Sequence, residues 1–254
     1  MANERLRGAL AAKRLTISEL AGQLGVDPKT AERWITKERV PHRTTREAIA
    51  ALLGAEPTYL WPSTAELMVT ASKAELVAFY PTRSAVPADL WRTLVSQAAH
   101  SLDILVYAGL FLPEQADMGL FLERARAGCK VRVLLGDPAG TAVALRGQEE
   151  GFGDGLAHRV TLALRYFEQL VDAPGVELRL HDTTLYASLY RSDDTLLANV
   201  HVLGAPAAQN PVLHLRRVPD GRVVDHYMRS FERVWIGAQP ILDLASLLAL
   251  VRGG

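Results

Sequence analysis

Histidines are the residues of this 254-residue chain best suited to acid–base or metal chemistry. Four of the seven lie in its last third, at His181, His201, His214 and His226, and their spacing is not that of a ligand set. The chain contains no HxH or HExxH pair, and Cys129 is its only cysteine. We therefore expect no metal site, no cofactor and no intramolecular disulfide.

The glycine-rich segments do not have the pattern of nucleotide-binding loops. Gly151, Gly153 and Gly155 lack the preceding strand that a dinucleotide fold requires, which favours a plain loop. Asp137 follows a predicted strand, where open α/β sheets place ligands, so it fits either a turn or a ligand contact. No GxxxxGK[ST] loop, GxSxG elbow or SxxK pair occurs, and we expect no catalytic residues.

The segment DPKTAERWITK, residues 27–37, has residue types suited to reading DNA. Asp27 can cap a helix whose first turn accepts Pro28. Helical spacing then places Ala31, Trp34 and Ile35 on one face, and Lys29, Thr30, Arg33 and Lys37 on the other. A short helix with one apolar face and one basic face is what a major-groove reader needs.

The flanking residues predict the other helices of a small all-α domain. Thr16 and Glu19 form the pattern of a capping box, and Gly25 ends that helix. Thr44 and Glu47 predict a second capping box, for a helix that ends at Gly54. We expect its core to include Ala48, Ile49, Leu52, Leu53, Tyr59, Leu60 and Trp61.

Residues 3–62 resemble the Cro/C1-type (XRE) helix-turn-helix of bacterial regulators, through TISELAGQLGVDPKTAERWITKERVP followed by REAIAALLG. The resemblance implies that Lys29, Thr30 and Arg33 contact base edges, and that Lys37, Arg39 and Arg43 approach phosphates. It also implies double-stranded DNA with a palindromic operator as the partner. Ile17 stands where family members often have a polar phosphate-binding residue. The alternative is a helical interaction module with a solvated charged face.

After residues 63–75, which fit a linker or a connecting helix, strand patterns alternate with helix patterns. This alternation predicts an α/β domain over 76–254, with a mixed, mostly parallel sheet and helices on both faces. The basic excess lies in the N-terminal part, since residues 1–62 hold ten Lys and Arg against seven Asp and Glu. Charges interrupt every long apolar stretch and no leader opens the chain, so we expect a cytoplasmic protein with no membrane partner.

The second domain resembles phospholipase D-like domains, through AAHSLDILVYAG, ARAGCKVRVLLGDP and SFERVW. Active members carry an HxKxxxxD signature, and its best register here places Tyr186, Ser188 and Asp193 at the histidine, lysine and aspartate. A tyrosine is a poor nucleophile toward a phosphodiester and serine carries no positive charge, so the resemblance implies an inactive domain. It also implies a cleft that could take a small ligand, lined by Tyr107, Tyr186, Ser188, His201 and His214.

These observations together predict a dimeric, DNA-binding bacterial transcriptional regulator. A helix-turn-helix needs two copies to read two half-sites, and a phospholipase D-like unit is half of the usual pseudo-dimer. The apolar segment 241–251 could pack on a partner subunit or on its own sheet. Two alternatives stay open: an active phosphodiesterase or nuclease brought to DNA by its head, and an antitoxin or defence-type interaction protein.

Overall fold

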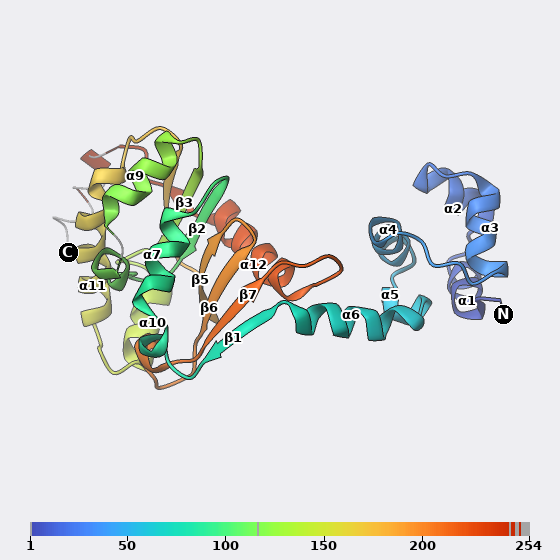
Figure 1. Ribbon diagram of the computed structural model, residues 1–254, viewed down its shortest axis with the longest axis horizontal. Coiled ribbons are helices and arrows are strands. Elements are labelled where there is room, and N and C mark those ends of the chain that lie inside the picture. Colours follow the sequence, from blue (N-terminus) through green and yellow to red (C-terminus); the bar gives the residue numbers. More distant parts are fainter. Residues whose placement is uncertain (1, 116, 244, 247–248, 250–254) are drawn as a thin grey trace. The chain divides into compact units, whose positions relative to one another are not determined.

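The computed structural model describes residues 2–115, 117–243, 245, 246 and 249 (Figure 1). The chain divides into two compact units. We call Met1–Lys73 with Pro219–Gly221 the head, and Ala74–Val218 with Arg222–Gly254 the body. Each unit has its own hydrophobic core. Segment 241–251 falls partly outside the described residues, so its packing is not described as a whole.

The head is helical, as expected. Its helices are α1 Glu4–Ala12, α2 Ile17–Leu24, α3 Pro28–Thr36, α4 Arg43–Leu53, α5 Pro57–Leu60 and α6 Ser63–Ala74, which runs one residue into the body. Segment 63–75, expected to be a linker or a connecting helix, is therefore helical over most of its length. The core comes from α1 to α5 and from Trp61 just after α5, and includes Leu6, Leu20, Trp34 and Ile49.

The helix ends around α3 follow the predicted pattern. Thr16 and Glu19 form a complete capping box at the start of α2, and Gly25 ends it with a φ of 64°. The Asp27 carboxylate accepts a hydrogen bond from the Lys29 backbone N–H over 2.8 Å, at the start of α3. The left-handed conformation at Gly25 costs glycine little, and it turns the chain directly into the next helix.

The expectations for α4 and α5 were wrong in three details. His42, not Thr44, is the N-cap residue of α4 and makes no side-chain cap, and the Glu47 carboxylate accepts from Arg43 Nε over 3.1 Å. Ala48 is exposed. Tyr59 is 54% exposed, and its ring lies beside the Arg5 guanidinium, whereas Leu60 and Trp61 are buried as expected.

The body consists of one sheet and six α-helices among the residues described. The strands are β1 Leu76–Tyr80, β2 Ser101–Leu105, β3 Lys130–Gly136, β4 Val176–His181, β5 Ala187–Ser192, β6 Thr195–Val200, β7 Val212–Arg216 and β8 Gln239–Pro240. The helices are α7 Ala88–Ser96, α8 Phe111–Gln115, α9 Met118–Arg126, α10 Thr141–Glu149, α11 Gly155–Phe167 and α12 Val223–Gly237. Sequence patterns had not indicated α10.

The sheet is mixed, but it is not mostly parallel, which corrects the prediction. The strand order is β1-β7-β6-β5-β2-β3-β4-β8. In the described part of the sheet only the pairs β2–β3 and β3–β4 are parallel. The tight turn at Asp193 and Asp194 folds β5 onto β6 as a hairpin, and hairpins are antiparallel. Buried strands have similar patterns in both directions, so their spacing did not reveal this.

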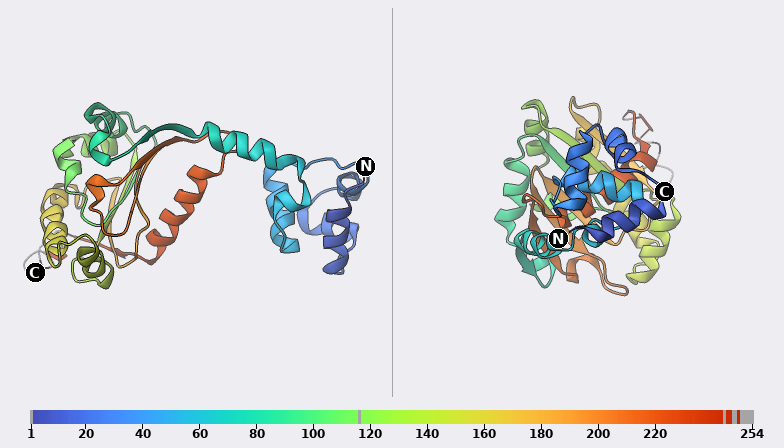
Figure 2. Two further views of the ribbon diagram at one scale, coloured as in Figure 1. Left: turned by 90° about the horizontal axis from the view of Figure 1, so that it is seen from below. Right: turned by 90° about the vertical axis from the view of Figure 1, so that its right-hand side faces the viewer.

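Helices cover both faces of the sheet, as expected. Helix α12 packs on one face, against β4 and β7, while α7 packs on β5 and α9 on β3 from the other face (Figure 2). Side chains of β2 alternate accordingly: Leu102 and Ile104 are buried in the hydrophobic core, while Asp103 takes part in ion pairs that reach α12. None of the described helices is both long and apolar enough to cross a membrane.

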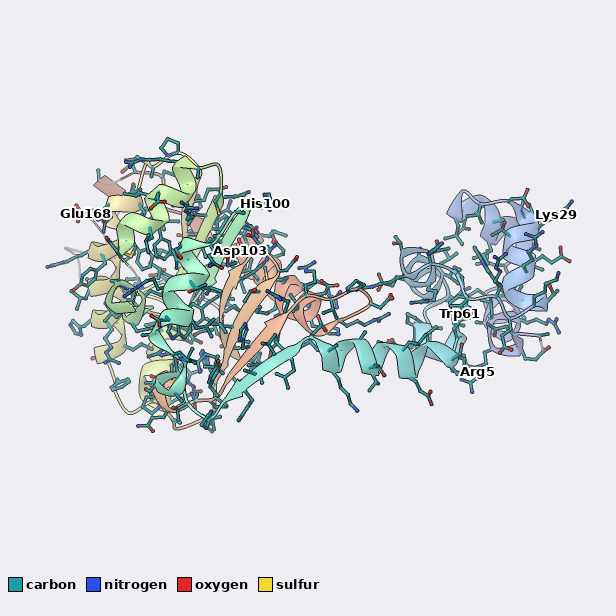
Figure 3. All side chains as sticks on the ribbon, viewed as in Figure 1. Arg5, Lys29, Trp61, His100, Asp103 and Glu168 are labelled. Atoms are coloured by element: carbon teal, nitrogen blue, oxygen red, sulfur yellow. The ribbon has the colours of Figure 1, made fainter. Side chains whose placement is uncertain are left out.

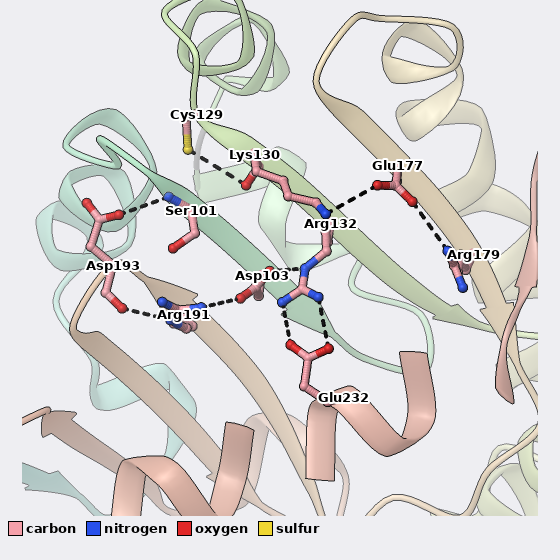
Figure 4. A network of polar contacts seen from close by, with 10 residues as sticks. All are labelled: Ser101, Asp103, Cys129, Lys130, Arg132, Glu177, Arg179, Arg191, Asp193 and Glu232. Atoms are coloured by element: carbon pink, nitrogen blue, oxygen red, sulfur yellow. Dashed lines mark hydrogen bonds and ion pairs between the residues drawn. The ribbon is translucent and has the colours of Figure 1, made fainter. Parts of the chain in front are cut away.

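A buried ion network joins the centre of the sheet to α12 (Figure 4). The Asp103 carboxylate, 0% exposed, accepts from Arg132 Nε and from Arg191 Nη1, each over 2.7 Å. Arg132 in turn makes two bonds to the Glu232 carboxylate of α12, of 3.0 and 2.7 Å. Because both oxygens of Asp103 have cationic donors, its charge is compensated within the sheet.

A second buried carboxylate fixes the start of α12. Glu75 is fully buried, and its two carboxylate oxygens accept from the backbone N–H groups of Val223 and Val224, over 2.7 and 3.2 Å. These are among the N–H groups that a helix start leaves without partners. The residue just before β1 therefore caps the helix on the sheet.

Candidate functional site

Helix α3 separates its side chains as a DNA-reading helix would. Ala31, Trp34 and Ile35 are buried, whereas Lys29 and Arg33 are exposed and Thr30 is partly exposed (Figure 3). The Asp27 cap and Pro28 stabilise the first helical turn of α3, so the backbone that carries the exposed donors is well ordered. Glu32 is the acidic residue on this exposed side. The face can donate hydrogen bonds to base edges.

The three residues expected at phosphates differ in their surroundings. Lys37, the C-cap residue of α3, is exposed, and so is Arg39. Arg43 is partly buried and already bonded to Glu47. Lys37 and Arg39 can therefore approach a phosphate directly, while Arg43 would first have to share or give up its contact with the carboxylate.

The body contains a pocket of about 480 Å³ next to the C-terminal ends of β2 and β6 and the N-terminal half of β5. Three of the five expected ligand contacts, Tyr107, Ser188 and His201, line it. The other lining residues are mostly apolar or aromatic, with Arg83, Glu150, Arg159 and Gln209 among the polar ones. This volume and composition are typical of small-molecule sites.

Ser188 and His201 form a fixed hydrogen-bonded pair in the pocket. His201 Nδ1 lies 3.0 Å from the Leu185 carbonyl oxygen, which can only accept, so the ring proton belongs on Nδ1. Nε2 is then an acceptor, and the Ser188 hydroxyl donates to it over 3.0 Å. The Tyr107 ring is stacked on His201, with ring centroids 5.9 Å apart, and the Tyr107 hydroxyl accepts from the Leu185 N–H over 2.8 Å.

The pocket keeps His201 uncharged at neutral pH. Burial lowers the pKa of His201 to about 4, helped by the positive charges of Arg146 and Arg83. Burial also raises the pKa of Tyr107, and that of Tyr190, which is fully buried in the pocket wall. The central groups of the pocket are therefore neutral hydrogen-bonding groups.

The charged pocket residues were not predicted from the sequence. Glu150 lines the pocket and pairs over 2.7 Å with Arg146, which is buried behind the lining, so these two charges compensate each other. The Arg83 guanidinium lies over the Phe111 ring, and that of Arg159 over Phe152. Arg83 lies on a short 3-10 turn after β1 and Arg159 on α11, and isolated arginines at such positions carry no recognisable motif.

The structure places the remaining expected contacts elsewhere. Tyr186 does not line the pocket and is 83% exposed. His214, on β7, lines a separate hollow of about 510 Å³ together with Asp193 and Arg216. Asp193 occupies the aspartate position of the signature, but its carboxylate accepts from the backbone N–H groups of Ala99, His100 and Ser101. The three signature positions therefore do not meet in one site.

The other residues considered for metal binding or ligand contact are buried or bonded to nearby backbone groups. The described residues contain no cluster of three or more His, Cys, Asp and Glu side chains that could hold a metal ion. His181 is buried, with Nε2 3.1 Å from the Val106 carbonyl oxygen, and burial lowers its pKa. Cys129 is buried, and the Asp137 carboxylate accepts from Ala139 N–H within its own turn.

Comparison with protein families matches residues 73–241 to a domain of unknown function, DUF5919. The chain belongs to the DUF5919 family. The matched residues contain every residue that lines the 480 Å³ pocket, and they end before the described C-terminal residues. The DUF5919 match does not include α3. Curated proteins gave no match.

Solved structures similar to this DUF5919 chain include three with low sequence identity. TrmBL2, an archaeal chromatin protein reported to bind DNA, is 16% identical with a TM-score of 0.41, over 85% of this chain and 72% of its own. Nuc of Salmonella typhimurium, a phospholipase D family member, is 12% identical with a TM-score of 0.37, and the match covers 64% of this chain and 94% of Nuc. Phosphatidylserine synthase of Haemophilus influenzae Rd KW20 is 15% identical with a TM-score of 0.47, and the match covers 66% of this chain and 40% of the synthase.

Proposed function

We propose that this chain is a cytoplasmic bacterial transcriptional regulator of the XRE type that binds a palindromic operator as a homodimer. In this proposal the body has a phospholipase D-like fold without its activity, pairs two heads and binds a small ligand. The observation that carries the proposal is the exposed donor face of α3, with Lys29, Thr30 and Arg33, on a helix whose other face is buried.

The chemistry of this face supports base reading. The guanidinium of Arg33 has the geometry to donate two bonds to guanine O6 and N7. Lys29 and Thr30 lie in the first turn of α3, which is where recognition helices contact base edges. Lys37 and Arg39 add exposed positive charge just after the helix.

Strand β1 supports the proposed homodimer. It lies at the end of the strand order, and among the described strands it pairs only with β7, so within this part of the chain its other side offers unpaired backbone groups. Val77 and Phe79 on this strand are 55% and 59% exposed. An exposed apolar edge strand is a ready template for pairing with another chain, and two copies of one edge can pair around a two-fold axis.

The proposed lack of phosphodiesterase activity is supported by the signature positions. Ser188 stands in the lysine position and its hydroxyl is hydrogen-bonded to His201, while Tyr186 lies outside the pocket.

The Ser188–His201 pair is the observation that favours the alternative, a hydrolase with a serine nucleophile. Incubation with bis(4-nitrophenyl) phosphate, with Tyr186→Phe and His201→Ala as controls, should show no turnover. Hydrolysis lost in His201→Ala would favour the enzyme.

Selection of duplexes from a random pool by the intact protein tests DNA binding. We expect enrichment of an inverted repeat with half-sites about 34 Å apart, one helical turn. Arg33→Ala should weaken binding to the selected site by about 1–3 kcal/mol and binding to random duplex much less. Arg7→Ala, which removes an exposed arginine of α1 in the same domain, is the matched control and should leave discrimination unchanged. A pool without enrichment at low salt would contradict the proposal.

A further inference from the structure

Two positive charges in the body pocket have no negative partner. The Arg83 guanidinium carbon lies 4.1 Å from the centroid of the Phe111 ring, and that of Arg159 lies 4.6 Å from the Phe152 centroid. Within the described part of the chain, neither arginine forms an ion pair with a carboxylate. The one acidic residue in the described pocket lining, Glu150, is paired with Arg146. The pocket therefore has an excess of positive charge.

The neutral groups of the pocket do not offset this charge. His201 is uncharged. Its Nδ1–H donates to the Leu185 carbonyl oxygen, and its Nε2 accepts from the Ser188 hydroxyl. The Ser188 oxygen keeps its acceptor lone pairs. The neighbouring wall is apolar and aromatic, from residues that include Leu110, Phe111, Phe152 and Leu156. Guanidinium groups next to an aromatic wall suit a ligand that carries an anionic group on an apolar frame.

We propose that the body pocket binds a small organic anion, whose acidic group is held by Arg83 and Arg159 and whose apolar part lies against Phe111 and Phe152. The inference rests on the ligand-binding role proposed above and names the chemical class of the ligand. The pocket volume of about 480 Å³ is in the range of sites for ligands of this size. Placing a negative charge beside the two guanidinium groups compensates them, which neutral ligands cannot do.

Fluorescence titration of the full chain with two matched probes tests this inference. 8-Anilinonaphthalene-1-sulfonate carries one sulfonate, and N-phenyl-1-naphthylamine is the same aromatic frame without it. We expect the sulfonate to bind about tenfold tighter or more, and Arg83→Gln and Arg159→Gln each to weaken it by about tenfold. The neutral probe should be unaffected. Arg92→Gln, an exposed arginine of α7 outside the pocket, is the matched control.

Displacement identifies the anionic group more closely. Naphthoate or naphthyl phosphate should displace the bound sulfonate probe, whereas naphthalenemethanol at equal concentration should not. Circular dichroism confirms that each variant is folded, and Arg83→Lys, which keeps the charge, should retain more affinity than Arg83→Gln.

Equal affinity for the two probes, or binding of the sulfonate that is unchanged in both glutamine variants, would overturn the inference. Failure of all the organic anions to displace the probe would do the same. None of these measurements uses DNA. A chain that failed to select an operator would therefore contradict the proposed regulator without affecting this result, and the reverse also holds.

Discussion

Ser188 of β5 donates a hydrogen bond over 3.0 Å to Nε2 of His201, the residue that follows the neighbouring strand β6. The pair resembles a nucleophile and its base, but the imidazole is oriented by the Leu185 carbonyl oxygen, not by a carboxylate. A carbonyl dipole stabilises an imidazolium less than a full negative charge does. Since the positive charges of Arg146 and Arg83 also disfavour a charged ring, the pair is better suited to fixed polar contacts than to proton transfer.

Protonation of His201 should destabilise the body below neutral pH. Its pKa is about 4 in the folded chain and near 6.5 when unfolded, so the unfolded state binds more protons between these values and stability falls as pH falls. From pH 7 to pH 5 the loss is about 2 kcal/mol. Urea unfolding at both pH values, compared between the parent chain and His201→Gln, measures it. His226→Gln removes an exposed histidine and should behave like the parent. Identical pH dependence in His201→Gln would contradict the expectation.

Lys37 and Arg39 should contribute to DNA affinity without affecting sequence preference. Each is exposed, and in the proposed complex replacement by alanine would remove one phosphate contact. The slope of log affinity against log salt concentration should then become shallower by about 0.9 per residue. Titration of the selected duplex and a scrambled duplex at several salt concentrations checks this. Lys73→Ala, outside the helix-turn-helix, should leave the slope unchanged, and a change of sequence preference in Lys37→Ala would reassign that residue to base contact.

Asp103→Ala should strongly destabilise the body. The substitution leaves Arg191 and one side of Arg132 without their buried anion, and breaking a buried pair in this way costs about 3–5 kcal/mol. Glu177→Ala provides the comparison, because Glu177 pairs with Lys130 and Arg179 where all three are more accessible to water. That change should cost at most about 1 kcal/mol. Urea midpoints for the two variants measure the difference, and equal costs would rule out the buried network as a main source of stability.

Phe79→Glu should favour monomers if the β1 edge joins two subunits. The side chain is exposed in the single chain, so the substitution should change the stability of the folded monomer by less than about 0.5 kcal/mol. Two copies of the new charge at a shared edge would repel each other. Sedimentation velocity over a range of concentrations gives the dimer fraction for the parent chain and the variant. Tyr166→Glu, an exposed aromatic on α11, is the control. A dimer unaffected by Phe79→Glu would place the interface elsewhere.

Local signals in the sequence predicted the helix ends on either side of Gly25 correctly. Thr16, Glu19, Gly25 and Asp27 act on residues only a few positions away, so their roles follow from spacing alone. The exception was α4, where Arg43 competes for Glu47 and the predicted box does not form. Competition between neighbouring side chains is not visible in a spacing rule.

The body depends more on contacts between distant residues, and its prediction was correspondingly less complete. Tyr107, Ser188 and His201 were expected near one another and do line one pocket, whereas Tyr186 and His214 do not. Strand direction, and the presence of Arg83 and Arg159 in the lining of one pocket, depend on how distant elements are arranged in space. A regular pattern of buried residues shows which residues face the core, but it does not show which strand lies next to which.

The cap that Glu75 provides for α12 determines where the body can be separated from the head. A recombinant fragment that starts at the first strand residue, Leu76, would lose this carboxylate and leave two amides of the helix start unsatisfied in the interior. Such a fragment should express poorly or melt early. Fragments for crystallisation or for ligand screening should therefore begin at or before Lys73, where the family match also begins.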